Sequence, residues 1–131
     1  MEEERAGLLL DWGTQTDRAS LEALIQECET SVGFGFKAGA AIKFVADPNH
    51  HCRIPNKRRV AGCWMQDFDL IVLEPAPRLG ETAICHELLH RQLFERRSDP
   101  DNGHVAPEWS ALAAGLSRFN ASRPADDVQP D

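Results

Sequence analysis

A pair of histidines four residues apart, with a glutamate directly after the first, constrains this chain more than any other feature. The pair, His86 and His90, stands in the stretch AICHELLHRQLFERR. Residues four apart lie on one face of an α-helix, so a helix would direct both ring nitrogens to a single point. We predict such a helix from Glu81 to near Ser98, because a proline follows at position 100. Its buried stripe is supplied by Ile84, Leu88, Leu89 and Leu93.

The residues HELLH match the pattern HExxH, which on a helix is a signature of zinc metallopeptidases. Zinc binds imidazole nitrogen at about 2.0–2.1 Å, and a site with three protein ligands keeps a fourth position open for water. Glu87 lies a step around the helix from the two histidines, so we predict it as the general base rather than as a ligand. The pattern therefore predicts a Zn²⁺ cofactor bound by His86 and His90. The alternative is a pair of merely structural histidines.

The third zinc ligand is expected after the turn signal DPDNG, which follows the predicted helix. We predict His104, because it lies downstream of a turn that returns the chain and because imidazole suits zinc. Carboxylates also bind zinc, so three acidic residues nearby are alternatives: Asp99, Asp101 and Glu108.

The pattern along the rest of the chain predicts an α+β domain. Apolar residues recur at helical spacing over 17–32 and from Pro107 to Phe119. We expect one domain over residues 1–119, with an N-terminal helix, a small three-stranded antiparallel sheet, the HExxH helix and a C-terminal helix. Residues 120–131 show no apolar period, so a disordered tail is expected there. The expected strands cover residues 41–48, 58–65 and 68–74.

The formal net charge is −7, which disfavours a general attraction to nucleic acid or to anionic membranes. No apolar run reaches membrane-spanning length, so no membrane partner is expected. One basic cluster departs from the acidic balance, and it consists of Arg53, Lys57, Arg58 and Arg59. We interpret it as a solvated hairpin; a rim that draws acidic peptide segments or a phosphate backbone toward the site is the alternative.

The acidic start MEEERAG does not resemble the basic start of a signal peptide, so we expect a cytoplasmic location. Disulfides are rare in the reducing cytosol. The chain has four cysteines and no CxxC pattern, which argues against a zinc ribbon. We therefore predict buried free thiols at Cys28, Cys52, Cys63 and Cys85.

The segment HELLHRQLF, the polar turn after it and GHVAPEW together resemble the SprT-like zinc metallopeptidases, the family that includes the Spartan protease. The stretch AGCWMQDFDLIVLEPAPRLGETAICHELLH is similar to the strands and the proline-containing bend that precede the active-site helix in that family. The resemblance covers about residues 20–119 and is most specific over 60–109. It implies a minimal, zincin-like metalloprotease fold.

The resemblance also implies roles for single residues. Glu87 would be the general base, Trp109 a core residue, and Glu108 a residue that does not bind the metal. The implied zinc ligands are His86, His90 and His104.

The leading functional expectation is a zinc-dependent metalloendopeptidase that acts on a protein or peptide and hydrolyses peptide bonds with zinc-activated water. One alternative is a zinc hydrolase acting on other amides or on esters. Another is a non-catalytic binding module that zinc stabilises. Catalysis is favoured because Glu87 is present and three ligands are evident, whereas a structural zinc site usually has four.

Overall fold

The structure is a computed structural model of the 131-residue chain. It describes residues 2–5, 8–11, 18–36, 41–44, 52–53, 59–60, 62–66, 70–73 and 81–122. Within these residues the helices are α1 Arg18–Val32, α2 Ile84–Arg97 and α3 Glu108–Ser122. The strands are β1 Glu2–Arg5, β2 Leu8–Asp11, β3 Ala41–Phe44, β4 Cys52–Arg53, β5 Arg59–Val60, β6 Gly62–Met65 and β7 Leu70–Leu73.

The three predicted helices are present close to their predicted bounds. Helix α2 ends where Ser98 adopts a left-handed backbone, with φ 59°, and donates its N–H to the Phe94 carbonyl at 2.7 Å. Helix α3 continues past Phe119 to Ser122, so the prediction of disorder from residue 120 is wrong for its first residues. A formed helix adds residues at little cost even where no apolar residue follows. Residues 123–131 lie outside the described part of the chain.

The main sheet is mixed, which corrects the predicted three-stranded antiparallel sheet. Its strand order is β1-β2-β3-β7-β6, and β4 pairs with β5 in a separate two-stranded sheet. Strand β3 runs parallel to both β2 and β7, whereas β6 and β7 are antiparallel as expected. Alternation of apolar and polar residues predicts a half-buried strand but not its direction, which depends on how the connecting chain runs. The α+β class itself is as predicted.

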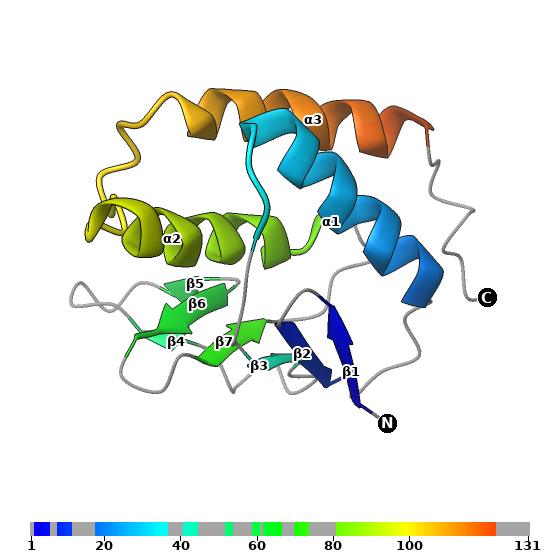
Figure 1. Cartoon of the computed structure of the whole chain (residues 1–131), viewed down its shortest axis with the longest axis horizontal. Coiled ribbons are helices and arrows are strands. Elements are labelled where there is room, and N and C mark those ends of the chain that lie inside the picture. The colour runs from blue at the N-terminus through cyan, green and yellow to red at the C-terminus, as the bar shows by residue number, and fades with distance from the viewer. Residues whose placement is uncertain are drawn as a thin grey trace.

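Helix α2 lies between the sheet and the other two helices (Figure 1). It packs on β6 and β7, while α1 packs on α3. Side chains from α1, β7 and α2 meet in one core, with Leu24, Ile71 and Leu89 fully buried. Helices α1 and α3 approach so closely that a Cβ on Gly115 would lie 2.8 Å from the Cβ of Ser31. Helix α2, which carries the HExxH residues, thus contacts the sheet on one side and shares a core with α1 on the other. These contacts fix its orientation.

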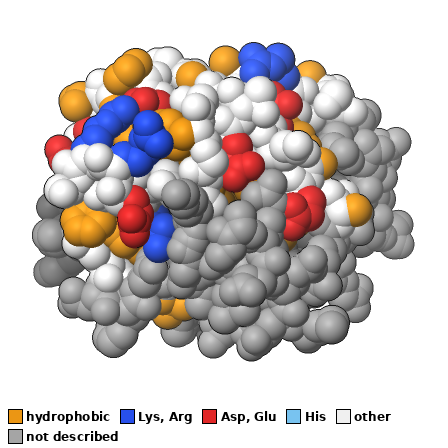
Figure 2. Space-filling model, viewed as in Figure 1, with side chains coloured by type: hydrophobic (Ala, Val, Ile, Leu, Met, Phe, Trp, Pro, Cys, Tyr) orange, Lys and Arg blue, Asp and Glu red, His pale blue; other side chains and the backbone are white. Residues whose placement is uncertain are grey.

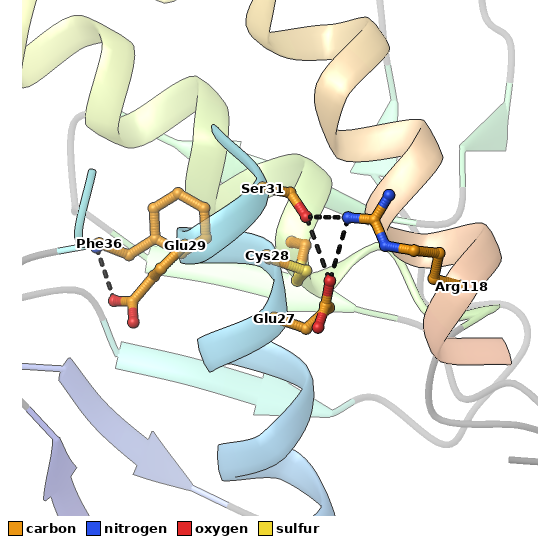
Figure 3. The surroundings of a disulfide bond; sticks show 7 residues. Glu27, Cys28, Glu29, Ser31, Phe36 and Arg118 are labelled. Carbon is orange, nitrogen blue, oxygen red and sulfur yellow. Dashed lines mark hydrogen bonds and ion pairs between the residues drawn. A yellow bond between two sulfur atoms is a disulfide. The ribbon is translucent and has the colours of Figure 1, made fainter. Parts of the chain in front are cut away.

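A disulfide joins α1 to α2, contrary to the predicted free thiols (Figure 3). Its cysteines, Cys28 and Cys85, are fully buried and their Cα atoms lie 6.4 Å apart. Cys63 is disulfide-bonded as well. The prediction was wrong because it took the redox state from an expected compartment, and sequence spacing does not show which cysteines face each other across a helix interface. The disulfide ties α2 to α1 one residue before His86.

One pair of charged side chains on the described surface joins α1 to α3. Arg118 on α3 bonds to Glu27 and Ser31 of α1, each at 3.2 Å (Figure 3), and such exposed pairs add little stability. Figure 2 shows basic side chains among hydrophobic ones on one face, and the guanidinium of Arg96 lies 4.3 Å from the centroid of the Phe34 ring. Among the described residues, no helix combines the length and the apolar character that a membrane crossing requires.

Candidate metal centre

Helix α2 and the loop after it bring three histidines together. His86 and His90 lie one turn apart on α2, and the loop that follows Ser98 returns His104 to the same face. The Nε2 atom of His104 lies 3.2 Å from Nε2 of His86 and 3.1 Å from Nε2 of His90. The three residues form a group that could hold a metal ion. The structure thus brings together the residues that the sequence predicts as ligands, while metal binding itself stays a prediction.

The converging ring nitrogens fit a bound cation. Burial, reinforced by the neighbouring rings, lowers the pKa of His86 to about 4, and burial also lowers the pKa of His90. Both rings are therefore neutral near pH 7, and neutral imidazoles are the form that binds metals. Tetrahedral coordination with metal–nitrogen bonds of about 2.0–2.1 Å would place the nitrogens about 3.3 Å apart. The two spacings that involve His104, 3.1 and 3.2 Å, are close to this value, and all three ligand atoms lie within 4.8 Å of one another.

The second ring nitrogen of His90, Nδ1, has a hydrogen-bond partner of the kind that metal-binding histidines have. This Nδ1 lies 2.7 Å from the carbonyl oxygen of Pro100, which accepts the Nδ1 proton. A proton on Nδ1 leaves the lone pair on Nε2, the nitrogen that faces His86 and His104. Metal-binding histidines usually have a carbonyl or carboxylate partner of this kind, which fixes the tautomer and the ring orientation.

The carboxylates considered as alternative ligands are engaged elsewhere. Asp99 accepts the backbone N–H of Asp101 at 2.9 Å. The Asp101 carboxylate accepts two hydrogen bonds from the backbone of its own loop and one from Trp109 in α3. Glu108 forms an ion pair with Arg97 at 2.7 Å, and the hydrogen bond from Arg97 lowers the pKa of Glu108. Among the described residues, the potential metal-binding group is composed of histidines alone.

Glu87 lies beside the histidine group, on the side of α2 that faces the sheet. Its side chain is buried, with 6% exposed, and burial raises its pKa to about 7. The backbone N–H of Trp64 in β6 donates a hydrogen bond to the Glu87 carboxylate, which limits this rise. A carboxylate whose pKa is close to neutral can both accept and release a proton at physiological pH. Glu87 is thus a buried carboxylate beside the histidine group that can exchange a proton near neutral pH, and its role as a general base stays a prediction.

Trp109 contributes more than the core role that the family resemblance implies. It is half-buried against the core, and its ring centroid lies 4.6–4.7 Å from the ring centroids of all three histidines. Its Nε1 donates to Asp101 at 2.6 Å. From the sequence, Asp101 is predicted only as an alternative ligand, and its bond to Trp109 is not predicted. In the sequence, the aspartate stands three residues before His104 and the tryptophan five residues after it. This spacing alone does not show that the two side chains bond to each other beside the histidines.

The basic cluster is only partly described. Arg53 in β4 pairs with Arg59 in β5 through the backbone, which agrees with the hairpin interpretation. The side chains of both arginines, together with Lys57 and Arg58, lie outside the described part of the structure. The cluster as a substrate rim therefore stays a prediction.

The chain was also compared with known proteins. No protein-family model, no curated protein and no solved structure matched it. The function proposed below is therefore inferred from the fold and the histidine group.

Proposed function

We propose that the chain is a zinc-dependent metalloendopeptidase of the SprT-like type, with a zincin-like fold. The observation that supports it most is the convergence of three imidazole nitrogens beside a buried carboxylate whose pKa is near 7. Metallopeptidases need three protein ligands, an open fourth position and a nearby general base. In this chain those parts would be His86, His90, His104 and Glu87.

When bound, zinc would supply the Lewis acidity that polarises a scissile carbonyl and acidifies water. The three histidines would orient their Nε2 lone pairs toward the ion, and the Pro100 carbonyl would hold the Nδ1 proton of His90. Glu87 would accept the water proton on its carboxylate and deliver it to the leaving amine. The Trp64 N–H, donated from β6, would keep the carboxylate oriented during this transfer.

A single substitution separates metal binding from proton transfer. Glu87→Gln keeps the size of the side chain and removes its basicity, so it should retain zinc and lose peptide hydrolysis. Glu95→Gln is the matched control, because Glu95 is an exposed residue of the same helix that pairs with Arg91 at 3.7 Å. We would measure zinc content and cleavage of a fluorogenic peptide library and of an unfolded protein. Hydrolysis by the purified Glu87→Gln protein at the wild-type rate would refute the assigned base.

The same measurements, extended to an ester and to a non-peptide amide, distinguish the competing functions. A wild-type protein that binds zinc and cleaves an ester or a non-peptide amide, but no peptide, would be a different zinc hydrolase. A zinc-bound protein inactive toward all three substrate classes would be a binding module. We favour a catalyst over a binding module because Glu87 is buried at the site with a raised pKa, a costly arrangement for a residue without a role in proton transfer. The choice of a peptide as the substrate rests on the HExxH pattern.

The proposed partner is a protein or peptide substrate. Nucleic acid is disfavoured by the net charge of −7. A cytoplasmic location also stays a prediction, and the Cys28–Cys85 disulfide weighs against it, because disulfides persist mainly in oxidising compartments.

A further inference from the structure

We propose that Asp101 is a positioning residue for the metal site, which holds the His104 loop in its binding conformation and anchors Trp109 behind the three histidine rings. The proposal rests on the metal centre proposed above and assigns a role to a residue outside the histidine group. Asp101 acts through the backbone of the loop and through the tryptophan ring.

The loop needs such a restraint because its backbone is strained. Asp101 and His104 both adopt the left-handed conformation, with φ of 60° and 57°. Residues with a Cβ adopt this region uncommonly. Asp and His do so more often than most, but two such residues in one short loop still cost conformational free energy that the contacts of the loop have to offset. A left-handed residue at the position of the third ligand is therefore a conformation that the rest of the loop has to maintain.

The restraint comes mainly from the Asp101 side chain. Its Oδ1 accepts the backbone N–H of Val105 at 3.1 Å, and its Oδ2 accepts the backbone N–H of Ala106 at 2.8 Å. The Asp101 carbonyl also accepts the N–H of His104 at 2.9 Å. These bonds attach both sides of His104 to one residue. Without the carboxylate, the two N–H groups after His104 would lose the acceptor that holds them in place.

Trp109 connects the same carboxylate to the ligand rings. Its Nε1 donates to Asp101 Oδ2 at 2.6 Å, the shortest of the three bonds. The Trp109 ring lies within 4.7 Å, centroid to centroid, of each histidine ring. A fixed indole limits the orientations that these rings can adopt. One carboxylate thus controls both the position of the third ligand and the surface against which all three ligands pack.

The test compares Asp101→Asn with Asp99→Asn. Asparagine tolerates the left-handed backbone at position 101, but its amide can accept hydrogen bonds on only one side and presents a donor on the other. Asp99 is an exposed carboxylate of the same loop that accepts one bond, so Asp99→Asn is the matched control. We expect Asp101→Asn to bind zinc about 10- to 100-fold more weakly than wild type in a chelator competition, the range typical for residues that support ligands indirectly. Asp99→Asn should stay close to wild type.

A second readout uses the metal-free protein, so it does not depend on zinc binding. The Trp109 indole N–H, assigned with a Trp109→Phe variant, should exchange slowly with solvent in wild type and in Asp99→Asn. In Asp101→Asn it should exchange faster, together with the Ala106 amide. A general loss of folding would instead accelerate exchange throughout the α1–α2 core, so core amides are the reference.

The outcomes separate this proposal from the proposed function. Wild-type zinc affinity in a folded Asp101→Asn protein would overturn the role of Asp101 while leaving the metal centre intact. A wild-type protein that binds no zinc would overturn the metal centre, and with it the role of Asp101 as a support for the site. Fast indole exchange in the wild-type protein would overturn the Asp101–Trp109 contact whatever the zinc result.

Discussion

The Cys28–Cys85 disulfide should supply a large share of the stability of this fold. It closes a loop with a sequence separation of 57 residues between α1 and α2. In the chain-entropy model, closing a loop of this length removes unfolded-state entropy worth about 4 kcal/mol at 25 °C. Small domains have a free energy of unfolding of about 5–15 kcal/mol, so breaking this link would remove a substantial fraction of it.

Urea unfolding of the wild type and of a Cys28→Ala/Cys85→Ala variant, each with and without reductant, tests this value. Reduction also breaks the disulfide of Cys63, but it does so in both proteins, so this contribution cancels. The wild type should lose about 4 kcal/mol more than the variant on reduction. Equal losses in the two proteins, or free thiols at Cys28 and Cys85 in the native oxidised protein, would show that this disulfide does not stabilise the fold.

Two other changes test the packing and the electrostatics. Gly115→Ala should lower the free energy of unfolding by about 1–3 kcal/mol, because the added Cβ would lie 2.8 Å from the Cβ of Ser31. Gly35→Ala is the control, because a Cβ there would meet no atom closer than 3.6 Å. Equal effects of the two substitutions would contradict the close approach of α1 and α3. In metal-free protein, wild type should lose about 2–3 kcal/mol of stability relative to Glu87→Gln between about pH 5 and pH 8. The pKa of Glu87 is raised from 4.5 to about 7, so over this range the folded state keeps a proton that the unfolded chain has lost, and stability falls as pH rises. A difference in stability between the two proteins that does not change with pH would contradict the raised pKa of Glu87.

The sequence was sufficient to predict the helices and the grouping of the histidines. Apolar spacing located α1, α2 and α3, because a helix that packs on a core shows its buried face in the sequence. The spacing of His86 and His90 follows from helical geometry alone. The approach of His104 was predicted from the turn signal before it, and the structure places its Nε2 within 3.2 Å of both other rings.

Features that depend on long-range contacts could not be predicted. The parallel pairing of β3 with β7 depends on the path of the intervening chain, which strand periodicity does not encode. Strand β1, with the sequence EEER, lacks the β-branched and aromatic residues that identify strands. The Cys28–Cys85 pairing and the Trp64 hydrogen bond to Glu87 each join residues from separate elements. The three hydrogen bonds of Asp101 are local, yet they require a left-handed turn that the sequence does not specify.

A metal centre made of three histidines should bind one zinc per chain, and the zinc content of wild type and of His104→Ala is the measurement that checks it. Elemental analysis after zinc reconstitution and gel filtration gives this ratio. Asp99→Ala, in the same loop, is a control for nonspecific binding by acidic side chains. We predict about one zinc per chain in wild type and in Asp99→Ala, and a clear loss in His104→Ala. No zinc in the wild type, or one equivalent retained with unchanged affinity in His104→Ala, would contradict the three-histidine centre.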